Sequence, residues 1–380
     1  MKKVLKWSGL LITAILVVFI YRGTYFDIPR EELESKYAIG ASGFLIMDDG
    51  SRIHYRDEGN VQGPAIVLLH GFNGSLFNFE RLVPLLADDF RLVSMDLPAF
   101  GLTGAVPSEN YTTENFMNTV LEVTTQLGLE KFSIAGNSMG GHTAWRYALQ
   151  YPDQMETLTL IAAAGVWTEE DLERASSEGP LIWKIMSSDL AKGVLLYFSP
   201  RFFSEQGLKT AIADPELVTE SLVDQFHQLA LLKGSREAFI SMFSDERGDW
   251  ANPEIFRNIT VPTLVVHGLE DNLLQVETSK HFEENIPIVE VKIYEGIGHL
   301  PMYEDPKRTA DDIRDFEVEG ISIGDSLLDF TSSKKINEKI NSYSDKGFIY
   351  NSKKYYALTF NSNDFNSNLK LYDQVQFHLK

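Results

Sequence analysis

The amino-acid sequence predicts an α/β fold built on a mostly parallel, eight-stranded sheet. Two patterns carry this prediction. From residue 44 onward, short apolar runs of strand length alternate with helical stretches, as in strand–helix–strand units. Late in this alternation, residues 167–249 show helical, aromatic-rich sequence without a strand pattern. This interruption indicates a helical cap inserted between two strands.

The strands and helices follow in order from these patterns. Apolar runs predict eight strands, at Phe44–Met47, Arg52–Arg56, Ala65–His70, Arg91–Met95, Phe132–Gly136, Thr157–Ile161, Thr263–His267 and Glu290–Tyr294. Apolar residues at helical spacing predict helices near Leu76–Leu86, Thr113–Leu127, Met139–Gln150, Glu277–Glu284 and Asp305–Phe316. Ligands of open α/β sheets bind at the carboxyl ends of the strands, so we expect the cap to lie over that edge.

Composition and charge exclude several classes of function. The 380 residues are 44% hydrophobic and carry a formal charge of −20. Such a chain can bury a sizeable core, and it is repelled by phosphate backbones, so we expect no nucleic-acid partner. The absence of cysteine excludes disulfides, thiolate nucleophiles and zinc–thiolate sites. We expect neither a metal nor a cofactor.

The amino terminus has the pattern of a membrane anchor. Three lysines precede an uncharged run of fifteen residues, Trp7–Tyr21. No small-x-small cleavage pattern follows, so we expect a retained single-pass helix over residues 1–22 rather than a cleaved signal peptide. The positive-inside rule then places the body of the chain on the non-cytoplasmic side, the periplasm in a bacterium. Residues 23–43 are expected to be a linker.

A candidate nucleophile lies in Gly136–Gly140, which has the pattern G-x-S-x-G. The pentapeptide follows a predicted strand and precedes a predicted helix. Glycines there allow a sharp turn that projects the serine, which predicts Ser138 as a nucleophile. The alternative is a serine that only caps the helix in a glycine turn.

The partners of such a serine follow in the order acid, then histidine. Asp271 ends the turn after the strand at Thr263–His267, and we prefer it to Glu270 as the orienting carboxylate. His299 lies in a glycine-flanked loop after the last predicted strand. A serine hydroxyl needs an imidazole to take its proton, and the imidazole needs a carboxylate to fix its tautomer.

The oxyanion of an acyl intermediate needs hydrogen-bond donors. One is expected from the backbone N–H of Met139, directly after the nucleophile. The second is expected from the N–H of Phe72, in the loop after the strand at Ala65–His70. His70 is expected to brace this loop and not to take part in catalysis.

Five motifs together resemble the α/β-hydrolase superfamily over residues from about 44 to 318. They are HGFNGS, MDLPAFGLT, GNSMGG, HGLED and GIGHLPMYEDP, and they occur in the family's order. The resemblance implies the site named above, with Ser138, Asp271 and His299 as the triad and Phe72 and Met139 as oxyanion donors. It also implies structural roles for Glu304 and Asp96. One departure is the turn around Phe100, where the family often has D-x-x-G-x-G.

Within this superfamily, serine at the elbow counts against the dehalogenase and epoxide hydrolase branches, which use aspartate there. The elbow resembles carbon–carbon bond hydrolases of aromatic ring-cleavage pathways. Those enzymes carry a cap arginine and a tryptophan after the histidine, where this sequence has Phe226 and Leu300. Phenylalanine after His-Gly is more similar to esterases and monoacylglycerol lipases.

The expected function is therefore hydrolysis of carboxylic esters through an acyl-enzyme. The cap is rich in apolar residues, which indicates either a lipophilic acyl pocket or the cap's own core; they include Leu181, Trp183, Leu196, Tyr197, Phe198, Phe202, Phe203, Met242 and Phe243. Carbon–carbon bond hydrolysis and a non-catalytic ligand-binding or sensor protein are the alternatives. Residues 319–380 are expected to form either a small α+β extension or an incomplete domain, with strands near Tyr355–Phe360 and Gln374–Leu379.

Overall fold

The structure is a computed structural model of the whole chain, and it describes residues 20–166, 196–242 and 252–318 with short segments elsewhere. These segments are residues 7, 13, 17–18, 193–194, 321–322, 356–361 and 374–379. The chain divides into two compact units, Met1–Phe316 and Glu317–Lys380.

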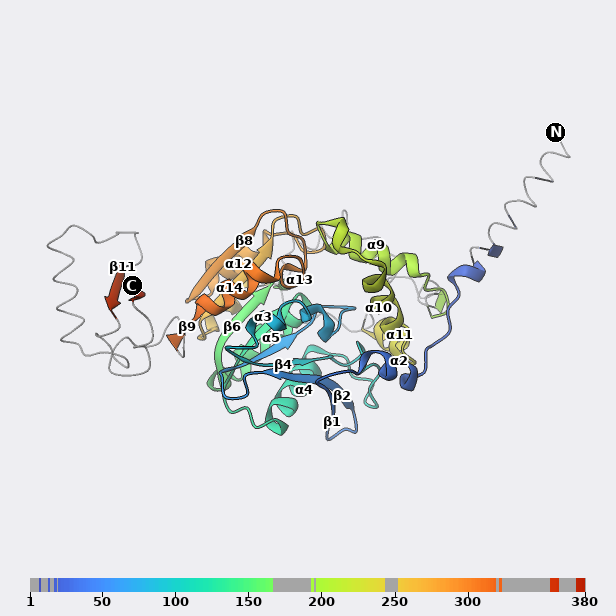
Figure 1. Cartoon of the computed structure of the whole chain (residues 1–380), viewed down its shortest axis with the longest axis horizontal. Helices are drawn as coiled ribbons and strands as arrows, with labels where there is room; N and C mark the ends of the chain where they lie inside the picture. The colour runs from blue at the N-terminus through green and yellow to red at the C-terminus, as the bar shows by residue number, and fades with distance from the viewer. Residues whose placement is uncertain are drawn as a thin grey trace. The chain divides into compact units, whose positions relative to one another are not determined.

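The first unit is built on one eight-stranded sheet in the order β1-β2-β4-β3-β5-β6-β7-β8 (Figure 1). Its strands are β1 (Ser42–Ile46), β2 (Arg52–Gly59), β3 (Ala65–Leu69), β4 (Arg91–Met95), β5 (Phe132–Asn137), β6 (Met155–Ile161), β7 (Thr263–Gly268) and β8 (Val289–Tyr294). Only the pairs β1–β2 and β2–β4 are antiparallel. All eight predicted strands are confirmed.

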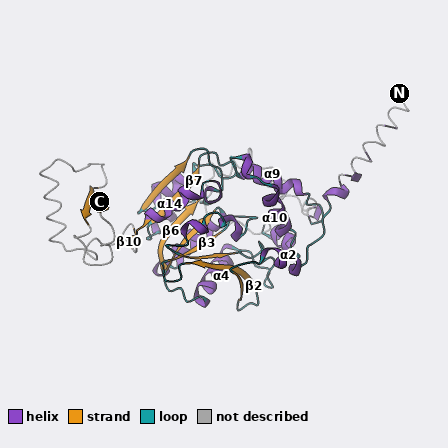
Figure 2. Cartoon of the chain, viewed as in Figure 1, coloured by secondary structure: helices purple, strands orange, loops and turns teal. Residues whose placement is uncertain are grey.

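Helices cover both faces of this sheet (Figure 2). The described helical segments outside the cap include α2 (Arg30–Tyr37), η1 (Leu76–Phe79), α3 (Val83–Leu86), α4 (Thr113–Gln126), α5 (Met139–Gln150), η2 (Pro152–Gln154), η4 (Pro253–Asn258), α12 (Thr278–Asn285), α13 (Pro301–Glu304) and α14 (Pro306–Phe316). Successive residues of a strand point to opposite faces. Val67 accordingly packs in the core with α4 and α5, whereas Leu68 packs with η1, α3 and α14.

The helix predicted at Leu76–Leu86 is interrupted. The structure has the 3₁₀ helix η1 followed by the short helix α3, with Pro84 in the first turn of α3. Proline has no N–H to donate, and its ring collides with the carbonyl four residues earlier, so one continuous helix cannot form. The other four predicted helices are confirmed within a few residues.

Among the described residues, four helical segments lie in the range 167–249, where the cap was predicted. They are α9 (Arg201–Ala211), η3 (Pro215–Leu217), α10 (Glu220–Ala230) and α11 (Ser235–Ser241), and we call them the cap helices. Most of residues 167–195 and residues 243–251 lie outside the described residues. In the second unit, β9 (Glu317–Val318) pairs with β10 (Ile321–Ser322), and β11 (Tyr356–Asn361) pairs with β12 (Gln374–Leu379). The last two confirm the predicted strands of the extension.

The predicted membrane anchor requires a correction. Most of residues 1–19 lie outside the described residues, and within the described part of the chain no helix has the length and apolarity needed to cross a bilayer. This finding contradicts the single-pass helix and, with it, the placement of the catalytic domain on the non-cytoplasmic side. The physical reason is length: fifteen uncharged residues reach about 22 Å as a helix, whereas the hydrocarbon core is about 30 Å thick.

Asp96, at the carboxyl end of β4, organises the turn that follows this strand. Its side chain is fully buried and accepts hydrogen bonds from Nδ1 of His54 (2.6 Å) and from the N–H groups of Leu76 and Leu102 (2.7 Å each). Burial alone would raise the pKa of this carboxyl, but the charge interaction and hydrogen bond with His54 outweigh burial and lower it. The expected turn-forming role of Asp96 agrees with these contacts.

The first prediction concerns Gly101, which lies in this turn with φ +54°. A Cβ atom there would lie 2.1 Å from Cγ of Asp96, so Gly101→Ala must displace a buried carboxylate. Gly128 has a similar φ of +69° but nothing within 4 Å of the same position, so Gly128→Ala is a matched control. We expect Gly128→Ala to cost about 1 kcal/mol, from backbone strain alone, and Gly101→Ala at least 2 kcal/mol more. Equal costs in urea unfolding would contradict this account.

Candidate active site

Ser138 lies in a sharp turn between β5 and α5. Its backbone has φ 53° and ψ −116°, a conformation that costs energy for any residue except glycine. The neighbouring Gly136 and Gly140 make this turn possible, because a Cβ on Gly140 would lie 2.2 Å from the carbonyl oxygen of Leu69. The serine is therefore presented half-buried at the carboxyl end of β5.

The loop after β3 lies directly against this serine. A Cβ atom on Gly71 would be 2.9 Å from Cβ of Ser138, so only glycine permits the approach. Phe72 follows in the same loop, half-buried, with its ring 5.5 Å from that of Phe100. Met139 is the first residue of α5, and the first N–H groups of a helix have no partner within the helix. The loop after β3 and the start of α5 thus both adjoin Ser138.

His70 holds this loop in place through two hydrogen bonds. Its Nε2 accepts a hydrogen bond from the N–H of Leu97 (3.0 Å), and its Nδ1 donates to the carbonyl oxygen of Gly71 (2.7 Å). Complete burial lowers the pKa of His70, which keeps the ring neutral for these two bonds. The loops after β3 and β4 are held together by one side chain.

Asp271 and His299 form a short, buried hydrogen bond. Nδ1 of His299 lies 2.6 Å from Oδ2 of Asp271, and both residues are less than 10% exposed. The other carboxylate oxygen accepts from the N–H groups of Leu273 (2.8 Å) and Leu274 (2.9 Å). Because Nδ1 of His299 donates to a carboxylate, its Nε2 is left as the basic nitrogen.

The electrostatics of Asp271 favour its ionised form. Burial alone would raise the pKa of this carboxyl, but the charge interaction with His299 and hydrogen bonds from His267 and His299 lower it well below its usual range. The carboxylate is thus available to orient an imidazole and to stabilise its cation.

His267 is a contributor that sequence reasoning missed. Its Nε2 lies 3.1 Å from Oδ2 of Asp271 and 2.9 Å from the carbonyl oxygen of Leu274, so this nitrogen carries the proton. Its Nδ1 then accepts from the hydroxyl of Ser279, 2.7 Å away. The position of His267 in β7, four residues before the acid, was visible in the sequence, but its partner in α12 was not.

The serine turn and the histidine loop are joined through Asn137. Its Nδ2 donates to the carbonyl oxygens of Ile161 and His299, each at 3.1 Å. Glu304 holds the same loop from the other side, since its carboxylate accepts from the N–H groups of Gly298 and Leu300 at 3.1 Å. Among the hydrogen bonds of the described residues, none joins Ser138 to His299 directly.

Several aromatic residues assigned to an acyl pocket lie on the outside of the cap. Tyr197, Phe202 and Phe203 are 65%, 57% and 45% exposed, so they do not line an interior. Among the described residues of the cap, α11 does contact the candidate oxyanion loop, and the ring of Phe239 lies 4.8 Å from that of Phe72. The other cap residues named in the prediction, apart from Leu196, Phe198 and Met242, lie outside the described residues.

Comparison with known proteins identifies the family. A model of the alpha/beta hydrolase fold matches residues 64–306, which is more than half of the chain. The chain belongs to the α/β-hydrolase family.

Relatives of this α/β hydrolase include both kinds of enzyme considered above. It is 27% identical to Lipase 1 of Psychrobacter immobilis, over 72% of this chain and 82% of that protein. It is also 27% identical to a 2-hydroxy-6-oxo-6-(2'-aminophenyl)hexa-2,4-dienoic acid hydrolase of Metapseudomonas resinovorans, over 68% of this chain and 84% of that one. Among solved structures, a membrane phospholipase A described as a bacterial virulence factor is similar with a TM-score of 0.60 and 25% identity, covering 83% of this chain and 97% of that one.

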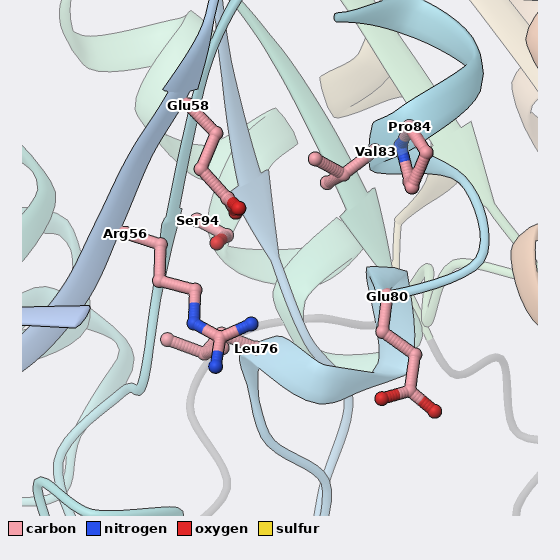
Figure 3. A pocket seen from close by; sticks show the side chains of 7 residues that line it. All are labelled: Arg56, Glu58, Leu76, Glu80, Val83, Pro84 and Ser94. Atoms are coloured by element: carbon pink, nitrogen blue, oxygen red, sulfur yellow. The ribbon is translucent and has the colours of Figure 1, made fainter. Parts of the chain in front are cut away.

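A small pocket of this α/β hydrolase contains none of the predicted site residues (Figure 3). It lies between β2, β4, η1 and α3 and is lined by Arg56, Glu58, Leu76, Glu80, Val83, Pro84 and Ser94. Burial raises the pKa of Glu80 despite the nearby cations Arg56 and Arg81.

Within the described ranges, no group of three or more His, Asp or Glu side chains could hold a metal ion.

The second prediction follows from the pKa of Asp271. A carboxyl whose pKa is lower in the folded than in the unfolded chain stabilises the fold above pH 4, and this contribution is lost as the pH falls below that value. Asp271→Asn removes it, so we expect this variant to be less stable than the wild type by about 2 kcal/mol or more at pH 7. The difference should shrink towards pH 3.

Urea unfolding at a series of pH values measures this difference. Asp153→Asn, at an exposed aspartate of η2, is the control and should match the wild type throughout. A cost of Asp271→Asn that is the same at pH 7 and pH 3 would show that the carboxylate is not the ionised, stabilised group inferred here.

Proposed function

We propose that this α/β hydrolase cleaves carboxylic esters through an acyl-enzyme on Ser138. The observation that carries the proposal is the 2.6 Å hydrogen bond between Asp271 and His299, in a loop that Asn137 ties to the serine turn. A buried acid that fixes the tautomer of a histidine beside a strained serine is the arrangement that nucleophilic catalysis requires. Catalytic hydrogen bonds to the nucleophile are often long before substrate binds.

In this mechanism, Nε2 of His299 takes the proton of Ser138 as Oγ attacks the ester carbonyl carbon. The carbonyl oxygen becomes an oxyanion, which the N–H groups of Phe72 and Met139 stabilise. The C–O bond to the leaving alcohol then breaks, and His299 returns the proton to that alcohol. Water repeats the sequence on the acyl-enzyme and releases the acid, while Asp271 orients the imidazole and stabilises its cation.

A lipophilic acyl group is the preferred substrate in this proposal. Phe72 and Phe239 present an apolar contact between the candidate oxyanion loop and α11, and Met139 and Met242 belong to the same apolar cluster. The similarity to a lipase and to a phospholipase A supports the same substrate class.

Carbon–carbon bond hydrolysis remains the second candidate, because a dienoic acid hydrolase is an equally similar relative. The surroundings of two residues near the histidine and in the cap favour ester hydrolysis over carbon–carbon bond hydrolysis. Phe226, where such enzymes are expected to carry a cap arginine, packs against an apolar cluster, and Leu300 after the histidine is buried in that cluster. Neither side chain can pair with the carboxylate of a dienoic acid.

The third prediction tests the nucleophile. We expect hydrolysis of p-nitrophenyl esters by the full chain, with kcat/KM rising from acetyl to a longer acyl chain. Ser138→Ala should lower kcat at least a thousandfold, because the remaining groups can then assist only the direct attack of water on the ester. The matched control is Ser133→Ala, which removes a buried serine of the preceding strand β5 and the 2.9 Å hydrogen bond that it accepts from Thr157. This control should lose stability and keep its kcat.

Three results would contradict the proposal. Ester hydrolysis that survives Ser138→Ala would exclude this serine as the nucleophile. A folded protein that is silent on all esters but cleaves a 2-hydroxy-6-oxo-2,4-dienoate would establish the second candidate. Binding of such compounds without turnover would indicate a non-catalytic protein on the same fold.

A further inference from the structure

Residues 23–38, expected to be a linker, are packed against the cap helices, and we call them the strap. The strap contains α2 and lies beside α10 and α11 (Figure 1). It lies outside the part of the chain that matches the family model.

The strap is joined to the cap by backbone hydrogen bonds at two places. At Thr24 it forms an antiparallel bridge to Phe198, and at Ile28 a parallel bridge to Leu232. The N–H of Ile28 donates to the carbonyl oxygen of Leu231 (2.8 Å), and the N–H of Lys233 donates back to Ile28 (3.1 Å). The strap thus adds a strand-like segment along the turn between α10 and α11.

The strap is also joined to the hydrolase body. Arg30 donates to the carbonyl oxygens of Leu102 and Thr103, in the turn that Asp96 organises. Leu33, 1% exposed, belongs to an apolar cluster shared by all three parts of the structure. The other buried members are Leu76, Phe77 and Leu102 of the body and Leu229 and Leu232 of the cap.

One side chain of α11 contacts the strap near the candidate site. Arg236, in α11, donates to the carbonyl oxygen of Tyr25 (2.9 Å) and forms an ion pair with Asp27 (2.5 Å). The guanidinium side chain is 10% exposed and the Asp27 side chain 31%, so water screens this pair less than it would screen a fully exposed one. One turn further along α11, Phe239 packs on Phe72 of the candidate oxyanion loop.

We propose that Asp27 and Arg236 are positioning residues for the ester hydrolysis. Their ion pair holds α11 so that Phe239 presses the loop of Phe72 against the serine turn, which fixes the oxyanion donor before substrate binds. This inference rests on the proposed function. It assigns a catalytic consequence to a contact between residues 209 positions apart in the chain.

The fourth prediction is a split between kcat and KM. An oxyanion donor acts in the transition state, so a displaced donor lowers kcat and leaves KM nearly unchanged. We expect Asp27→Asn and Arg236→Gln each to lower kcat about tenfold, less than the hundredfold or greater loss from deleting a whole donor. Since the two residues act as a pair, the double variant should be no slower than the slower single variant.

Two controls separate positioning from general stability. Arg236→Lys can still donate to Asp27 and to Tyr25, so it should recover most of the wild-type kcat. Arg201→Gln removes ion pairs to Asp224 and Glu220 that lie within the cap, and it should keep kcat unchanged. All rates are measured well below the thermal midpoint of each variant.

Amide hydrogen exchange on the same full-length variants provides a readout that needs no activity. Asp27→Asn should accelerate exchange at Ile28 and Lys233 and at the loop around Phe72. If the wild type hydrolyses no ester, the proposed function fails, and faster exchange at Phe72 would still support the positioning contact. Unchanged exchange at Phe72, or a lower thermal midpoint with unchanged kcat, would overturn the inference.

Discussion

A carboxylate that is removed from water must accept hydrogen bonds within the protein, and three carboxylates at the carboxyl ends of the strands are buried in this way. Asp96 follows β4, Asp271 follows β7 and Glu304 lies in α13, shortly after β8. Each accepts backbone N–H groups from the loop beside it, and the two aspartates also contact a histidine. Because these loops supply the donors, their conformations are fixed around the same edge of the sheet, next to Ser138.

The same requirement extends to the cap and the strap. Glu304 also accepts the N–H of Ala213, just after α9, and the N–H of His299 donates to the carbonyl oxygen of Ala211 (2.6 Å). One end of the cap is thereby fastened to the candidate base, and the turn between α10 and α11 is fastened to the strap. The cap is held at two places by polar contacts whose loss would leave buried groups unpaired. Changes far from Ser138 can therefore alter the geometry around it.

The strands of the sheet and the loops that follow them were predictable from local patterns. Each apolar run and each glycine turn is specified by residues that are neighbours in the sequence. The contact of Asp271 with His299 followed from the family's motif order. The hydrogen bonds that link Ser279, His267 and Asp271 did not follow from the motifs, since they depend on how α12 packs on β7. The strap was missed because REELESKY is polar and buries only Leu33, although its acidic first turn and Lys36 near its end are helix signals. The anchor was wrong because charge pattern was given more weight than the short length of the uncharged run.

Reaction with a fluorophosphonate tests the central claim most directly, because this reagent forms a covalent bond only with an activated serine. Oγ of the serine attacks phosphorus, fluoride leaves, and the proton passes to the neighbouring base. Mass spectrometry of the intact chain and of its peptides should find one label, on Ser138, and His299→Ala should slow labelling at least about a hundredfold. An unlabelled wild type, a label on another residue, or equal labelling without His299 would contradict the account.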